Sequence, residues 1–194
     1  MGKRLTKIYT RNGDQGQTGL GTNVRVAKHS LRVQAMGDVD ELNSWLGHIR
    51  SALGQDHRLD SLLSQVQHDL FDIGGELAMP GYELVPTQLV NDLEDNIDVL
   101  NADLPPLDNF ILPAGNEAAS RTHIARSVAR RAERQLWALS TVEAAANLDE
   151  KARVSPLSIQ YLNRLSDFLF VLARVVATEN GGKEILWQSR HNQP

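Results

Sequence analysis

Apolar side chains recur every three or four positions along most of the chain, a spacing that places them on one face of an α-helix. The first such segment runs from residue 29 to 53 and the second from 59 to 77, where a Pro-Gly pair at 80–81 predicts a stop. Thr87 is the predicted N-cap of a third helix, which ends near residue 103, ahead of two consecutive prolines.

The second half of the chain predicts two longer helices. One begins near Asn116 and includes residues 121–137. The other follows Ser155, an N-cap with proline at the first helical position, and ends near Asn180, ahead of two glycines. Residues 140–154 fit either an extension of the fourth helix or a loop. No convincing strand pattern is present, so the sequence predicts an all-α fold, an up-and-down bundle of five helices.

The predicted fourth helix carries its charged side chains on one side. Wound at about 100° per residue, residues 121–137 place a cationic front on roughly a third of the circumference. The front consists of His123, Arg126, Arg130, Glu133, Arg134 and Trp137. The opposite side is apolar and consists of Ala125, Val128, Ala129, Ala132, Leu136 and Leu139. Arginine suits a phosphate or carboxylate held at two points, but a solvated face or a salt-bridged seam between subunits would have the same composition.

Residues 8–28 are rich in glycine and small polar side chains. Glycines permit positive φ and close backbone approach to a ligand, and successive N–H groups can form an anion-binding nest. Arg11, Arg25 and Lys28 would add positive charge. The stretch contains neither a Walker A loop nor a dinucleotide-binding fingerprint. It predicts an ordered loop, with a flexible N-terminal arm as the alternative.

The predicted fifth helix has a polar stripe on an otherwise apolar surface. The stripe consists of Gln160, Asn163, Arg164, Asp167 and Arg174. Polar groups in such surroundings are costly unless they are paired. Salt bridges to the fourth helix would satisfy them, and this is the structural alternative to a ligand site.

Composition narrows the function classes. The chain has 194 residues and no cysteine, which excludes disulfides, thiolate metal sites and a cysteine nucleophile. Its formal net charge of -4 argues against a general nucleic-acid binder. The most apolar run, residues 168–177, is interrupted by Arg174 and is too short to span a membrane. The N-terminal residues lack the apolar core of a signal peptide, so we expect a cytoplasmic protein.

Two common chemistries find no support in the sequence. The six histidines form neither an HxxxH pair nor a Glu-x-x-His motif. His68, Asp69 and Glu76 are interpreted as a polar helix edge and not as a ligand set. A hydrolytic triad is not indicated, because a GxSxG elbow is missing.

Five segments, in the same order, resemble the PduO-type ATP:cob(I)alamin adenosyltransferases. The segments read KIYTRNGDQGQTGL, RVQAMGDVDELNSWLG, FILPAG, HIARSVARRAERQ and SPLSIQYLNRLSDFLFVLAR, and together they extend from about residue 7 to Arg174. The resemblance implies a five-helix bundle assembled as a homotrimer with active sites between subunits. It also implies transfer of the 5′-deoxyadenosyl group of ATP to the cobalt of a reduced corrinoid, with release of triphosphate.

The resemblance implies a single domain over residues 1–194, with an ATP-binding loop at 1–28, a helical bundle at 29–180 and a tail at 181–194. The residues of the loop that would wrap the triphosphate are Thr10, Arg11, Asn12, Gly13, Asp14, Gly16, Thr18, Gly19 and Lys28. The neighbouring subunit would supply the remaining ATP-binding residues, which are Arg130, Arg131, Ala132, Glu133, Arg134 and Asn163.

Further roles are implied by the same resemblance. Arg130, Glu133, Arg134 and Phe110 would be the catalytic residues, with Phe110 under the corrin, where it excludes the lower axial base. Asp40 would pair across the interface with Arg130. Mg²⁺ would be held by the ATP phosphates, with Glu133 as a candidate protein ligand, and K⁺ is a further candidate ion. The implied partners are a reductase that supplies cob(I)alamin and a B12-dependent enzyme that accepts the product.

One departure from the family pattern is the sequence LPAG, where the family usually has LPGG, so Ala114 narrows the backbone freedom beside Phe110. Two rival interpretations differ in class. A sensor or cofactor-delivery module would bind ATP or corrinoid without efficient turnover, but the complete set of leaving-group residues favours an enzyme. A purely structural bundle would not explain the glycine-rich loop.

Overall fold

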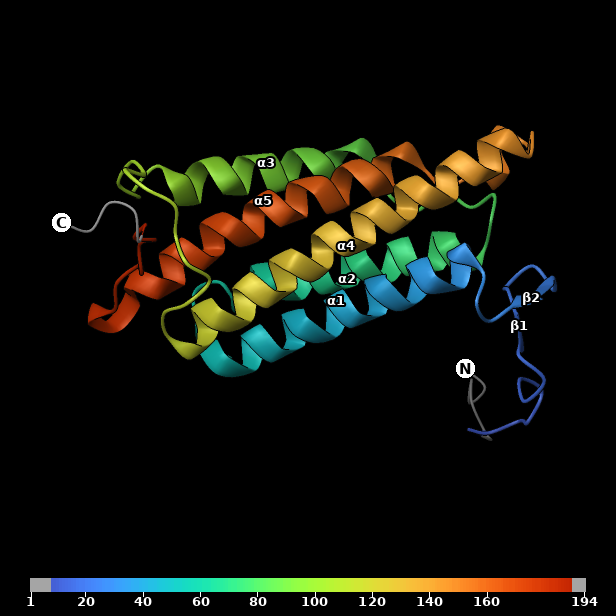
Figure 1. The fold of residues 1–194 in the computed structure, drawn as a ribbon, viewed down its shortest axis with the longest axis horizontal. Helices are drawn as coiled ribbons and strands as arrows, with labels where there is room; N and C mark the ends of the chain where they lie inside the picture. Colours follow the sequence, from blue (N-terminus) through green and yellow to red (C-terminus); the bar gives the residue numbers. More distant parts are fainter. Residues whose placement is uncertain (1–7, 190–194) are drawn as a thin grey trace.

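Five helices account for most of the computed structural model, which describes residues 8–189 (Figure 1). They are α1 (Leu31–Leu53), α2 (Asp60–Ala78), α3 (Thr87–Asn101), α4 (Glu117–Ala145) and α5 (Pro156–Thr178). Two short 3₁₀ helices, η1 (Glu150–Ala152) and η2 (Glu179–Gly181), flank α5. The predicted five-helix fold is therefore confirmed, while the first seven and last five residues of the predicted loop and tail lie outside the described residues.

The helix ends follow from local sequence. Asn116 caps α4 by accepting a hydrogen bond from the backbone N–H of Ala119 at 2.9 Å, and Ser155 caps α5 ahead of Pro156. The prediction for α3 was one residue off, because Pro86 is the N-cap and Thr87 is the first helical residue. Pro86 combines the fixed φ of proline with an extended ψ of 159°, which suits the position before a helix.

The bundle has one continuous apolar core. α4 packs on α5 and on α1, α2 covers the other side of α1, and α3 covers α5. Leu42, Leu136 and Phe168, one from each of three helices, are fully buried in the shared core. The predicted apolar back of α4 is buried along its whole length, from Ala125 to Leu139. Tight burial of this back fixes the direction in which the opposite face of α4 points.

Several polar groups lie inside the bundle and are satisfied there. Asp69 accepts a hydrogen bond from the hydroxyl of Tyr161 at 2.8 Å, and Glu76 accepts one from Ser158 at 2.5 Å. The interpretation of Asp69 and Glu76 as a polar edge was therefore wrong, because both are buried and only His68 is exposed. A carboxylate can occupy such a site when its oxygens accept hydrogen bonds.

A short β-hairpin precedes the bundle, so the expectation of no strand was also wrong. β1 (Gln17–Gly19) pairs antiparallel with β2 (Arg25–Ala27). Each strand has three residues, too few for an alternating pattern to be recognised in the sequence. The hairpin lies beyond the end of the bundle where α1 begins (Figure 1). It is attached there by a hydrogen bond from the N–H of Gly21 to the carbonyl of Ala78 at 2.8 Å.

Candidate functional site

The front of α4 presents two arginines one helical turn apart. Arg130 and Arg134 are exposed, and Glu133 between them is half-buried. The guanidinium of Arg134 donates a hydrogen bond to the carbonyl of Arg130 at 3.0 Å, so this side chain lies along its own helix. Arg130 and Arg134 therefore place two cations on the same exposed face.

Glu133 is held by the neighbouring helix. The side-chain amide of Asn163 on α5 donates to a carboxylate oxygen of Glu133 at 3.1 Å. The alternative, salt bridges from the α5 stripe to α4, is not found within residues 8–189, because Arg164 pairs with Glu94 on α3 and Arg174 pairs with Glu184. Asn163 is thus the member of the stripe that connects α5 with the charged front of α4.

Arg131 has a different environment from its neighbours. Its guanidinium forms ion pairs with Asp38 at 3.0 Å and with Glu41, both on α1. The hydrogen bond that Arg131 donates to Asp38 is the main cause of a raised pKa for Arg131. Ala132 is fully buried. Arg131 therefore braces α4 against α1 within the subunit, and its predicted contact with ATP, like that of Ala132, stays a prediction.

The glycine-rich loop is ordered by its own hydrogen bonds. Arg11 has a φ of 64°, and the turns that follow place the N–H of Gly16 at 3.2 Å from the carbonyl of Gly13. Arg25 donates to the carbonyl of Asn12 at 2.7 Å. The N–H of Lys28 donates to the carbonyl of Gly16 at 2.9 Å. These bonds link the two arms of the hairpin and favour the ordered loop over a free arm.

The side chain of Lys28 lies close to the backbone of the turn at Gly13. A Cβ atom at Gly13 would lie 2.8 Å from the ammonium nitrogen of Lys28. The ammonium group therefore packs directly over the backbone of the turn. Thr10, Asp14, Thr18 and Gly19 lie on the same exposed hairpin or its approach, so the predicted loop residues are brought together.

The loop and the front of α4 are separated within one subunit. The hydrogen bond from Gly21 to Ala78 attaches the loop to the end of α2, and the other loop bonds described above stay within residues 10–28. Arg134 is followed by eleven more residues of α4, which corresponds to about 16 Å of helix. The hairpin lies past the end of the bundle (Figure 1).

Phe110 is at the opposite end of the bundle, in the proline-rich connection. Its ring is 78% exposed. Its carbonyl accepts a hydrogen bond from the N–H of Trp187 at 2.7 Å, and the two rings meet edge to face at a centroid distance of 6.3 Å. The backbone that carries Phe110 is therefore fixed although the side chain projects into solvent.

Three cavities within the described residues have volumes between about 430 and 670 Å³, and Phe110 lines one of them. It has a volume of about 550 Å³ and is also lined by His123, Arg126 and Phe170. Sequence reasoning placed His123 on the exposed front of α4, which was wrong, because only 5% of the residue is accessible. The helical pattern indicates the side of α4 on which His123 lies. It does not indicate that the connection at residues 107–111 lies against this side and lines the same cavity.

His123 and Arg126 are incompletely satisfied at the wall of this cavity. His123 Nδ1 and Arg126 Nε are buried and have no hydrogen-bond partner among the described residues. Burial lowers the pKa of His123, and the charge of Arg126 lowers it further. Burial and the nearby Arg130 likewise lower the pKa of Arg126. Unpaired buried polar groups beside a cavity are typical of functional sites.

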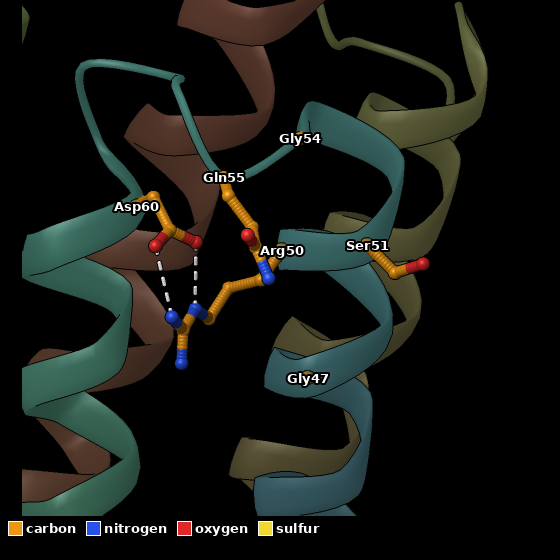
Figure 2. A pocket seen from close by; sticks show the side chains of 6 residues that line it. All are labelled: Gly47, Arg50, Ser51, Gly54, Gln55 and Asp60. Carbon is orange, nitrogen blue, oxygen red and sulfur yellow. Dashed lines mark hydrogen bonds and ion pairs between the residues drawn. The ribbon is translucent and has the colours of Figure 1, made fainter.

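The other two cavities differ in character. The first, shown in Figure 2, contains Arg50, whose guanidinium forms two hydrogen bonds to the carboxylate of Asp60, at 2.7 and 2.8 Å. It includes none of the predicted site residues. The second is an apolar groove of about 670 Å³ between α1 and α2, with Phe71 exposed in its wall. Asp40 lines this groove, and no hydrogen bond or ion pair joins it to another residue of the described range 8–189.

Two kinds of feature are absent from residues 8–189, a metal-binding cluster and a membrane-spanning helix. No cluster of three or more histidine or acidic side chains within residues 8–189 is arranged to hold a metal ion. No helix in that range is long and apolar enough to cross a bilayer.

The sequence matches known proteins over most of its length. The model of the family described as cobalamin adenosyltransferase matches residues 8–176. A cobalamin adenosyltransferase of Cupriavidus metallidurans is 51% identical over 97% of both chains. A corrinoid adenosyltransferase of Mycobacterium leprae is 44% identical over 97% of this chain and 98% of its own.

Solved structures give the same result for the fold. A phenylalanine-to-alanine variant of a PduO-type ATP:corrinoid adenosyltransferase from Lactobacillus reuteri, complexed with cobalamin and ATP, superposes with a TM-score of 0.81. It is 34% identical, and the match covers 94% of this chain and 100% of that one. An arginine-to-lysine variant from the same organism, complexed with ATP, has a TM-score of 0.80 at 34% identity.

Proposed function

The chain belongs to the cobalamin adenosyltransferase family, and we propose that it transfers the 5′-deoxyadenosyl group of ATP to the cobalt of a reduced corrinoid. The cobalt–carbon bond forms as the bond between C5′ and the triphosphate oxygen breaks, and inorganic triphosphate leaves. The protein is thus a transferase. The observation that carries this proposal is the front of α4, where Arg130, Glu133 and Arg134 lie together. The opposite, apolar side of the helix is buried in the core and holds this front in place.

The chemistry assigned to these residues is positioning and charge stabilisation. Arg130 and Arg134 would grip neighbouring phosphates and stabilise the leaving triphosphate. Reduced cobalt is a strong nucleophile, so no general base is needed at C5′. The apolar Phe110 would face the corrin and exclude a lower ligand from cobalt, while its fixed backbone keeps the ring in place.

Mg²⁺ fits this site as a partner of the phosphates. The half-buried Glu133 has one oxygen engaged by Asn163, which leaves the other for a metal or its water. A single carboxylate suits Mg²⁺, which usually takes one or two protein oxygens and the remaining ligands from phosphate and water. Mg²⁺ would neutralise phosphate charge there. Binding of K⁺ stays a prediction.

The active site is proposed to lie between subunits of a homotrimer. The separation of the glycine-rich loop from the front of α4 supports this arrangement, because two halves of one ATP site are far apart in a single chain. Asp40 supports it as well, since this exposed carboxylate has no ion partner in the described part of its own chain. We assign the protein to the cytoplasm, with a cob(I)alamin-producing reductase and a B12-dependent acceptor enzyme as partners.

The proposal is tested with purified protein, ATP, Mg²⁺, cobalamin and a strong reductant under anaerobic conditions. We expect loss of the cob(I)alamin absorbance and formation of adenosylcobalamin. Arg134→Ala should lower turnover by about a hundredfold, since a phosphate clamp acts on the developing charge, with little change in melting temperature. ATP binding without any conversion would instead support the sensor or delivery module.

A further inference from the structure

A line of hydrogen bonds connects three helices and ends at Glu133. Glu94 on α3 accepts from Nε of Arg164 at 2.5 Å. Nη1 of Arg164 donates to the side-chain oxygen of Asn163 at 2.8 Å, and the amide nitrogen of Asn163 donates to Glu133 at 3.1 Å. Glu94 and Arg164 lie behind the predicted site and belong to none of the sets that the sequence indicated for ATP.

This arrangement fixes the orientation of an asparagine amide. Asparagine presents an acceptor at one end and donors at the other, and a carboxylate only accepts. If the amide of Asn163 turned over, its oxygen would face the carboxylate of Glu133 and the two acceptors would repel. Arg164 prevents this because it offers a charged donor to the oxygen end.

The pair formed by Glu94 and Arg164 is a weak candidate for a stabilising contact. Their side chains are 47% and 40% exposed. Exposed ion pairs contribute little to stability, because water screens the two charges and holding both side chains in place costs entropy. A role in holding Asn163 accounts for the geometry better, because the same guanidinium contacts both Glu94 and Asn163.

We propose that Arg164, oriented by Glu94, is a positioning residue that holds Asn163 and, through it, the carboxylate of Glu133 in the geometry that receives ATP. The inference rests on the proposed function. One oxygen of Glu133 is engaged by Asn163, and no hydrogen bond within the described residues engages the second, which stays available to a ligand. Removal of Arg164 releases the amide and with it the carboxylate.

The test replaces Arg164 with methionine, which keeps most of the side chain's length without its donors. Loss of one ordinary hydrogen bond lowers an equilibrium or rate constant about two- to tenfold. Misplacement of the Glu133 carboxylate adds to this loss, so we expect kcat/KM for ATP to fall about tenfold or more. The KM for the corrinoid and the melting temperature should stay close to wild type. Arg164→Lys should recover part of the loss.

Two further variants make the test specific. Glu94→Gln should also lower kcat/KM for ATP, but by less. The double variant Glu94→Gln, Arg164→Met should have the same kcat/KM for ATP as Arg164→Met alone, because both changes act through Asn163. Arg58→Met is the matched control, since Arg58 is an exposed arginine that pairs with Glu179 far from this line. It should leave all kinetic constants unchanged.

The outcomes separate the inference from the proposed function. If wild-type protein neither binds MgATP in calorimetry nor forms adenosylcobalamin, the proposed function and the positioning role of Arg164 are both wrong. If wild type is active and Arg164→Met has the same ATP constants, the positioning role is wrong and the enzyme assignment stands. A large drop in melting temperature with equal losses for both substrates would show a structural role and would also overturn the inference.

Discussion

Phe110 is an exposed aromatic side chain on a backbone that is held in place. Single exposed apolar residues are common on protein surfaces and need no explanation on their own. Phe110 differs because Trp187 fixes its carbonyl and packs on its ring, and because it borders a cavity that is also lined by the buried His123 and the half-buried Arg126. A fixed, solvent-facing ring is suited to pack on a flat apolar ligand.

Phe110→Ala should therefore affect the corrinoid and leave the fold intact. The ring is 78% exposed, so its removal creates no internal cavity and the melting temperature should change little. Reactions that start from cob(II)alamin should slow by at least about tenfold, equivalent to 1.4 kcal/mol of barrier, because the lower ligand is no longer excluded. Assays that start from cob(I)alamin, with ATP varied, provide the comparison. Equal rates for the variant and wild type from cob(II)alamin would refute the assigned role.

The positions of single side chains were predictable where they depend on helical direction alone. Arg130 and Arg134 were placed correctly on the exposed front of α4. His123 was not, because the segment that buries it is distant in sequence. The pairing of Arg131 with Asp38 was equally hidden, since two helices can be aligned in several registers with the same apolar pattern.

At the scale of elements, the helices were predictable and the connections were not. The repeat of apolar residues and the N-cap residues predicted the positions of α4 and α5. Both signals are local, because burial of one face and capping of the first turn depend on residues only a few positions apart. The β-hairpin and the segment 146–154 depend on contacts with α1 and α2. Their conformations are therefore decided by tertiary structure and not by local propensity.

A buried ion pair holds this connection to the bundle. Arg32 on α1 pairs with Glu143 on α4 and donates to the carbonyls of Leu77 and Ala152 at 3.1 and 3.2 Å. Glu143 also accepts from the N–H of Val154 at 2.9 Å. The pair thus joins α1, α2, the end of α4 and the segment that leads into α5.

Arg32→Met should destabilise the protein by about 3–5 kcal/mol, because it leaves a buried carboxylate without its cation. The measurement is the free energy of unfolding in urea. Arg32→Met combined with Glu143→Leu should be less destabilised than the single variant, since no unpaired charge remains. A single variant as stable as Arg58→Met, the exposed control, would show that the pair does not hold the connection.

At the scale of the molecule, the residues proposed to bind ATP fall into two groups at different places in one chain. The β-hairpin lies beyond one end of the bundle, whereas α4 runs along the bundle (Figure 1), and Arg134 lies eleven residues before the end of α4. The sequence indicated both groups through the family resemblance, but composition and periodicity alone do not indicate their separation. A site shared between subunits brings the two groups together without a change in the fold.

The shared site predicts that two inactive variants complement each other. Lys28→Ala removes a loop cation, and Arg134→Ala removes an α4 cation, so each homotrimer alone should have little activity. When the two are unfolded, mixed in equal amounts and refolded together, random assembly into a ring gives about a quarter of the interfaces an intact loop from one subunit and an intact α4 from the next. Activity should rise to about a quarter of the wild-type value, while each variant refolded alone stays inactive. If loop and helix of the same chain formed the site, every site in the mixture would carry one defect and no recovery would occur.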